Sequence, residues 1–337
     1  MPTEVIEHRE AASATPRKLS TVRGRQDVLF RAAARSGGTT VLLIMTLVGV
    51  FLFVRGFDAI TDAGTAFITT EAWSPNEGNF GIAAVLFGTV TIATIAIVLA
   101  VPLSIGTALY ISEFAPRGLK RSLITIVDLM AAVPSVVYGL WGFLWLTDAI
   151  LPIAEWISTH FGWIPIFDVD GFEPGDPLST TTVFTASAFI AGIVVGLMVT
   201  PIASSIMREA FSQAPVGERE GALALGATRW GMVTSVVLPF GRGGIIGGTM
   251  LGLGRALGET IAVYLVISPV FVIQPNILQT GTNSISSLVA LRFNEASEFE
   301  LSALMAAGLA LFLMTLVINF GASMVIARSR SGAESEG

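Results

Sequence analysis

Six apolar runs, each long enough to cross a lipid bilayer, constrain this chain more than any other feature of its sequence. They cover approximately residues 39–57, 81–109, 122–147, 183–207, 244–269 and 303–327. A bilayer core of about 30 Å needs about 20 apolar residues of helix, and backbone groups in lipid must bond within their own segment. Only 13% of the residues are charged, against about a quarter in soluble domains. The expected fold class is therefore an all-α integral membrane protein with six transmembrane helices in the lipid bilayer.

Basic residues are unevenly distributed among the connections, and their distribution predicts the orientation of the chain. The segment before the first run, the C-terminal tail and the connections 110–121 and 208–243 hold most of the Lys and Arg residues, while the other connections are mainly acidic. Cytoplasmic loops carry an excess of Lys and Arg, so we expect both termini in the cytoplasm. The expected organisation is a disordered tail, a membrane domain and a second short tail: 1–36, 37–328 and 329–337.

The fifth run contains two charged residues, Arg255 and Glu259. If its helix begins near Gly244, Arg255 lies about 17 Å along the axis, near the middle of the bilayer. Residues four apart face the same side of a helix, and an ionised group at this depth costs about 2.5–3.5 kcal/mol. Either the pair lines a polar path for a solute, or it is a structural ion pair.

The segment 218–239 is too polar to span a membrane, and its pattern predicts two short helices. We expect the helices to break at Gly226 and the second to stop at Pro239. This helix–turn–helix either presents a surface to another protein or lies on the lipid surface. The helix that follows contains closely spaced glycines, which permit close helix packing: Gly244, Gly248, Gly252, Gly254 and Gly258.

The same segment resembles the EAA loop of ABC-importer permeases. The matching positions are Glu220, Ala222, Gly226, Leu238 and Pro239, and Gly221 replaces the first alanine of the motif. The resemblance implies that the connection 208–243 is a coupling loop, in which a short helix docks into a separate ATPase subunit.

A second motif narrows the resemblance to phosphate-importer permeases of the PstC type. The stretch Gly252–Val263 resembles their signature, whereas the companion PstA type has Ala-Pro-Leu where this chain has Ile-Ala-Val. Further matching stretches are 108–116, 132–142 and 283–285. The resemblance implies the type I ABC-importer permease architecture in a prokaryotic plasma or inner membrane.

The expected partners follow from this resemblance. They are a PstA-like permease that packs on the glycine-rich helix, a cytoplasmic ATPase dimer, and an extracytoplasmic phosphate-binding protein. Inorganic phosphate would pass Arg255, whose planar guanidinium offers an oxyanion several donors. Glu259 would either neutralise Arg255 or accept the proton of hydrogen phosphate. Another oxyanion (sulfate, molybdate or phosphonate) and an ATP-independent secondary carrier remain alternatives.

The sequence contains no P-loop motif, so we expect no ATPase activity in this chain and no cofactor of its own. ATP and Mg²⁺ would bind to the partner ATPase. The sequence also has no cysteine and no paired-histidine metal motif. Its net charge of −6 gives no reason to expect nucleic acid as a partner.

Overall fold

The computed structural model describes residues 25–173, 176 and 179–330. The chain divides after Val50 into two units, and helix α1 (Arg25–Ala63) begins in the first and continues into the second. Residues 25–36 are therefore helical, in contrast to the disordered tail expected there. This stretch is rich in Arg and Ala, which are strong helix formers. The remainder of the expected tail lies outside the described residues.

The second unit is built almost entirely from helices. After α1 come α2 (Ala66–Thr69), α3 (Ala83–Leu109), α4 (Arg117–Ala131), α5 (Ser135–Trp141), α6 (Thr147–Phe161), α7 (Ala188–Ser212), α8 (Val216–Ala224), α9 (Arg229–Met232), α10 (Leu238–Phe240), α11 (Arg242–Gly258), α12 (Ile261–Val266), α13 (Ile285–Arg292) and α14 (Glu298–Arg330). Three π-helical turns join neighbouring helices: Tyr110–Phe114, Gly142–Leu146 and Val233–Val237. Two short antiparallel strands, β1 (Trp73–Ser74) and β2 (Asn79–Phe80), pair with Trp73 opposite Phe80.

Five helical stretches in the described residues are long and apolar enough to cross a membrane. They are 26–63, 83–114, 135–161, 188–212 and 298–321. The pair Arg229–Phe240 and Arg242–Gly258 is bent by 66° and becomes a sixth candidate if it is counted as one span. The predicted class of an all-α membrane protein is confirmed.

The third span differs from its predicted bounds of 122–147. Helix α4 ends at Ala131, and a new helical stretch begins at Ser135 and continues to Phe161. Pro134 causes the break, because proline has no backbone N–H to donate and disfavours helical geometry in the residue before it. The apolar run therefore belongs to two helices, and only the second is long enough to span.

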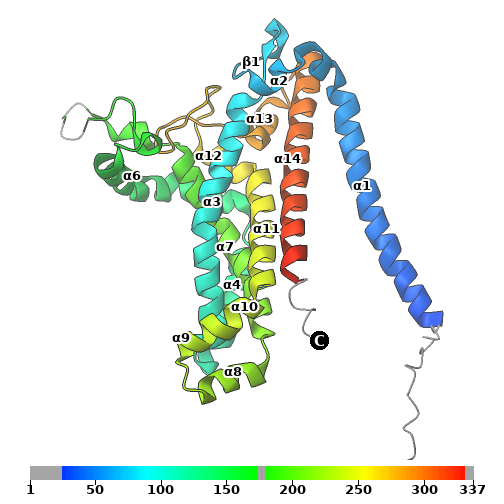
Figure 1. The fold of residues 1–337 in the computed structure, drawn as a ribbon. Coiled ribbons are helices and arrows are strands. Elements are labelled where there is room, and N and C mark those ends of the chain that lie inside the picture. The colour runs from blue at the N-terminus through cyan, green and yellow to red at the C-terminus, as the bar shows by residue number, and fades with distance from the viewer. Residues whose placement is uncertain (1–24, 174–175, 177–178, 331–337) are drawn as a thin grey trace, which may run out of the picture. The chain divides into compact units, whose positions relative to one another are not determined.

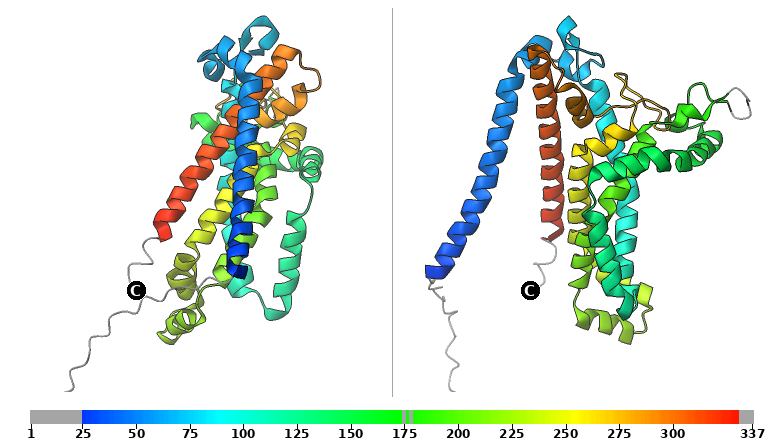
Figure 2. Two further views of the ribbon diagram at one scale, coloured as in Figure 1. Left: turned by 90° about the vertical axis from the view of Figure 1, so that its right-hand side faces the viewer. Right: turned by 180° about the vertical axis from the view of Figure 1, so that it is seen from behind.

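Helices α3, α7 and α11 lie side by side and form the core of the second unit (Figures 1 and 2). The centre of α7 is almost completely buried, with Val194, Val195 and Val199 at 0% exposure. The small residues of α7 let α3 approach closely, since a Cβ atom at Gly196 would lie 2.9 Å from the carbonyl oxygen of Ala96. Helices α3 and α7 are therefore closely packed, and α11 lies against them.

The two ends of this core carry different structures (Figure 1). Helices α8 and α9 lie at one end, and the β1–β2 hairpin with α2 lies at the other. The predicted polar helix–turn–helix is thus separated from the hairpin by the length of the core helices.

Candidate functional site

A pocket of about 670 Å³ lies among α7, α11 and α14. Its lining is mostly apolar and includes a single charged residue: Ile202, Gly247, Met250, Leu251, Gly254, Arg255, Asn319 and Ser323. The side chain of Arg255 is exposed rather than buried among other side chains. The structure therefore places the predicted arginine in a pocket on the side of a membrane helix.

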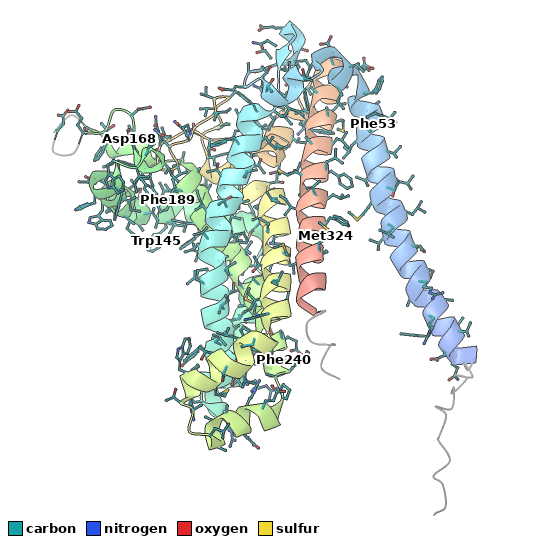
Figure 3. All side chains as sticks on the ribbon, in the orientation of Figure 1. Phe53, Trp145, Asp168, Phe189, Phe240 and Met324 are labelled. Atoms are coloured by element: carbon teal, nitrogen blue, oxygen red, sulfur yellow. The ribbon has the colours of Figure 1, made fainter. Side chains whose placement is uncertain are left out.

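Two polar side chains of α14 face the same pocket. The amide of Asn319 lies beside α11, since a Cβ atom at Gly254 would lie 3.7 Å from Asn319 Oδ1. The hydroxyl of Ser323 donates to the carbonyl of Asn319 at 2.9 Å, which leaves the Ser323 oxygen lone pairs free to accept. Figure 3 labels Met324, the position on α14 that follows Ser323. The pocket thus combines donors and acceptors.

Asn319 and Ser323 were not predicted from the sequence, although a signal for them exists. Asn319 is the only amide in the apolar run 303–327, and Ser323 follows it by four positions. Polar residues four apart share one face of a helix, and polar side chains within a span usually face other protein or a water-filled cavity.

Glu259 does not share a helix face with Arg255, so this part of the prediction is wrong. Helix α11 ends at Gly258, and Glu259 has an extended backbone (φ −67°, ψ 126°). Its side chain is buried, its Oε1 atom accepts from the backbone N–H of Ala262 at 3.2 Å, and its carbonyl accepts from Ser286 at 2.7 Å. Glu259 is absent from the pocket lining, and no ion pair joins it to Arg255 in the described part of the chain.

A buried polar network surrounds the interruption between α11 and α12 at Glu259. Ser284 and Ser287 form a reciprocal capping box at the start of α13, and the backbone N–H of Ile285 donates to Thr89 on α3 at 3.0 Å. Asn283 Oδ1 accepts from Ser287 Oγ at 3.0 Å. The stretch 283–285, noted in the sequence as a family match, therefore joins α13 to α3.

The glycine positions of α11 fall into two groups. Cβ atoms at Gly244, Gly248 and Gly252 would contact Ala210, Ala203 and Val199, all on α7 of the same chain. The expectation that a second permease packs on this stripe is therefore incorrect for these three positions, because α7 already occupies it. Gly254 faces Asn319, and a Cβ atom at Gly258 would meet no atom within 4 Å.

The loop at the end of the core forms the predicted helix–turn–helix. Gly226 separates α8 from α9 and has a φ of +88°, which L-residues with a side chain rarely adopt. Ala222 and Leu238 pack against a buried cluster beneath the loop, while Glu220 is exposed. The second helical stretch ends at Phe240 (labelled in Figure 3), one residue beyond the predicted stop at Pro239, and the chain then bends by 66° into α11.

Several apolar side chains of this loop point outward. Among them, Leu225 is 92% exposed, Trp230 is 60% exposed and Leu223 is 44% exposed. Exposed charged side chains, Glu220 among them, lie on the same helix–turn–helix. We call this set, Glu220, Leu223, Leu225 and Trp230, the loop surface.

Similarity to known proteins defines the class to which this chain belongs. Residues 100–331 match the family described as the inner membrane component of binding-protein-dependent transport systems, so the chain is a member of that family. Members are multi-pass, non-catalytic membrane subunits of ABC importers, and they act with an ATPase and a substrate-binding protein.

The curated relatives are more specific. The chain is 36% identical to the phosphate transport system permease protein PstC 2 of Mycobacterium tuberculosis over 89% of this chain and 92% of the relative. It is 37% identical to the PstC protein of Xylella fastidiosa (strain 9a5c) over 93% and 94% of the two chains. The resemblance predicted from the sequence is confirmed.

Solved structures with the same fold support the architecture. A bacterial alginate ABC transporter matches with a TM-score of 0.55 at 18% identity and covers 89% of this chain and 97% of that chain. The methionine ABC transporter MetNI matches with a TM-score of 0.52 at 14% identity, covering 74% and 95% of the two chains. The chain therefore has the fold of type I ABC-importer permeases.

Proposed function

We propose that this chain is the PstC-type permease subunit of an ATP-driven importer of inorganic phosphate. The observation that carries the proposal is its 36–37% identity to phosphate transport permeases over about nine-tenths of its length. The structural neighbours belong to methionine and alginate transporters and are only 14–18% identical, so they support the fold and not the cargo.

The pocket chemistry supports an oxyanion as the transported solute. Arg255 supplies a permanent positive charge and several N–H donors, and Asn319 adds a neutral amide donor. Hydrogen phosphate also carries one O–H group, which needs an acceptor. The lone pairs of Ser323 supply one, whereas a fully ionised sulfate would leave that acceptor unused.

The loop surface is the proposed contact with the ATPase. Apolar side chains this exposed on a polar loop favour burial by a partner protein. We propose that a cytoplasmic ATPase dimer, which binds ATP and Mg²⁺, moves the loop, and that a PstA-like permease completes the path. An extracytoplasmic phosphate-binding protein would deliver phosphate at the opposite end, and both termini of this chain would be cytoplasmic.

Uptake of radiolabelled phosphate tests the proposal. The complete complex, with the companion permease, the ATPase dimer and the binding protein, is reconstituted in liposomes. We expect uptake to require ATP and to resist an excess of sulfate, molybdate or phosphonate. Competition by one of these anions would identify a different cargo, and full uptake without ATP would identify a secondary carrier.

A further inference from the structure

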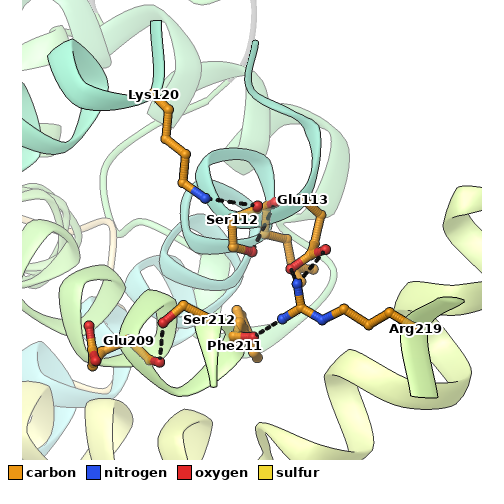
Figure 4. Close-up of polar contacts among 8 residues, drawn as sticks. Ser112, Glu113, Lys120, Glu209, Phe211, Ser212 and Arg219 are labelled. Atoms are coloured by element: carbon orange, nitrogen blue, oxygen red, sulfur yellow. Dashed lines mark hydrogen bonds and ion pairs between the residues drawn. The ribbon is translucent and has the colours of Figure 1, made fainter. Parts of the chain in front are cut away.

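Arg219 of α8 connects the loop to the ends of two core helices (Figure 4). Its guanidinium lies 3.3 Å from Glu113 Oε1, and the same nitrogen donates to Glu113 Oε2 at 3.4 Å. A second guanidinium nitrogen donates to the backbone carbonyl of Phe211. Glu113 lies in the π-helical turn that ends α3, and Phe211 lies in the last turn of α7. One side chain thus holds three elements together.

This contact is shielded from solvent. The side chain of Glu113 is 6% exposed and that of Arg219 is 20% exposed. The last carbonyls of a helix have no partner within the helix and carry a partial negative charge, so a cation is favourable there. Exposed ion pairs of flexible side chains contribute little, but the carboxylate of Glu113 is buried, and a second nitrogen of Arg219 is held by the carbonyl of Phe211. This contact therefore fixes the position of α8 on the core.

Phe211 links the same contact to the base of α11. Its ring is fully buried, and a Cβ atom added at Gly241 would overlap the ring. Gly241 is the residue between α10 and α11, where the two parts of the bent pair meet at 66°. Arg219 therefore donates a hydrogen bond to the backbone of Phe211. The ring of Phe211 packs against Gly241 at the hinge of α11, and α11 is the helix that carries Arg255.

We propose that Arg219 is a positioning residue that transmits the displacement of α8 to α11, acting through Glu113 and Phe211. This role rests on the proposed contact between the loop surface and the ATPase. When α8 moves, the buried pair carries the ends of α3 and α7 with it, and the Phe211 ring shifts against Gly241. The pocket at Arg255 then changes because α11 turns about its hinge. Without Arg219, the ATPase would bind and hydrolyse ATP but the movement would not reach the pocket.

The test compares variants within the complete complex in lipid. They are Arg219→Ala, Glu113→Ala, the double variant, Arg219→Lys and the control Arg117→Ala. Arg117 is an exposed arginine at the start of α4, so its removal deletes one positive charge near the same turn. Three quantities are measured: ATPase co-purification, the rate of ATP hydrolysis, and phosphate taken up per ATP hydrolysed.

We expect Arg219→Ala to keep the bound ATPase and to lower phosphate uptake per ATP by at least about tenfold, because one partner of a buried pair is then unpaired. Glu113→Ala should act in the same direction, and the double variant should be less impaired than the sum of the two single effects. Arg219→Lys should give an intermediate phosphate uptake per ATP, since lysine keeps the charge but lacks the second nitrogen that donates to Phe211. An unchanged ratio in Arg219→Ala, or a loss of complex in proportion to uptake, would overturn the proposal.

A second readout is independent of the transported solute. The chain has no native cysteine, so a spin label on Leu251→Cys, an exposed position of the pocket, reports on α11 alone. We expect ATP to change the label's mobility in the otherwise unchanged chain and with Arg117→Ala, but not with Arg219→Ala. If the unchanged complex carries no phosphate but the label still responds in this pattern, the proposed cargo is wrong and the role of Arg219 stands. A response that survives in Arg219→Ala refutes that role.

Discussion

At the scale of single residues, Arg255 and Glu259 have different neighbours although only four positions separate them. Arg255 faces a pocket, whereas Glu259 is buried and accepts a hydrogen bond from Ala262 at the start of α12. A charge within a membrane costs about 2.5–3.5 kcal/mol, and water in the pocket or a bound anion lowers that cost. The pocket therefore lowers the cost of the charge on Arg255. Glu259 instead stabilises the interruption between α11 and α12.

The first prediction separates these two roles. Arg255→Leu should abolish phosphate uptake, and adding Glu259→Gln should not restore it, because the two side chains are not paired. Glu259→Gln alone should retain most uptake, since its amide oxygen can still accept from Ala262. Uptake in assembled complex is the measurement. Recovery in the double variant would show a structural ion pair, and loss in Glu259→Gln would show that its charge is required.

The second prediction concerns Asn319, which contributes its amide to the same pocket. Hydrogen bonds to charged groups contribute about 1.5–3 kcal/mol, so Asn319→Leu should weaken phosphate transport by about tenfold or more. Phe320→Leu is the control, because Phe320 is 64% exposed and lies outside the pocket lining. Equal uptake in the two variants would show that Asn319 does not contribute to the phosphate path.

The third prediction concerns the turn at Gly226. Its φ of +88° is unfavourable for alanine, and left-handed backbone costs L-residues about 1–2 kcal/mol. Gly226→Ala should therefore distort the loop surface and reduce ATPase co-purification from membranes. The matched control is Gly221→Ala, because Gly221 lies within α8 and a Cβ atom there meets nothing within 4 Å. Equal co-purification of the two variants would contradict the expected role of the turn.

At the scale of elements, α11 is held between the hinge at Gly241 and the break after Gly258. Its glycines let it lie directly on α7, and Arg255 lines the pocket among α7, α11 and α14. Helix α12 then packs against α5, where a Cβ atom at Gly139 would lie 2.8 Å from Ala262 Cα. Helix α11 is thus a short helix with an interruption at each end, and it carries Arg255 into the pocket lining.

The fourth prediction tests the packing of α11 on α7. A Cβ atom at Gly248 would lie 2.9 Å from the backbone oxygen of Ala203, whereas one at Gly243 would meet nothing within 4 Å. Gly248→Ala should lower stability by about 1–3 kcal/mol through overpacking. Gly243→Ala should be neutral or stabilising, because alanine favours helix more than glycine does. Thermal unfolding of the purified complex provides the measurement, and equal midpoints would contradict this packing.

At the scale of the whole molecule, the orientation in the membrane is the main open prediction. Ser74 lies in the β1–β2 hairpin, and Ser235 lies in the loop at the other end of the core. We expect Ser74→Cys and Asp170→Cys to react with an impermeant maleimide added to intact cells, and Ser235→Cys to react only after the cells are opened. Asp170 and Ser235 are both exposed, so access to the side chain does not decide the outcome. Labelling of Ser235→Cys in intact cells would contradict the predicted orientation.

The sequence alone determined the class of protein, because the properties that define it are local. Apolar runs of span length identify membrane helices without knowledge of their neighbours. The loop motif at Glu220 and Gly226 and the signature around Arg255 identified the family, whose membership is confirmed. The turn at Gly226 was also predictable, because a glycine between two amphipathic segments is a local signal.

Only the tertiary structure decided which residues meet. The break at Pro134 divided a run that hydropathy treats as continuous, and the helix end at Gly258 moved Glu259 away from Arg255. The contact of Arg219 with Glu113 joins residues 106 positions apart, and Asn319 reaches the pocket from the last helix. Such contacts depend on how α3, α7, α11 and α14 pack in three dimensions. Periodicity along one helix carries no information about the helix that packs beside it.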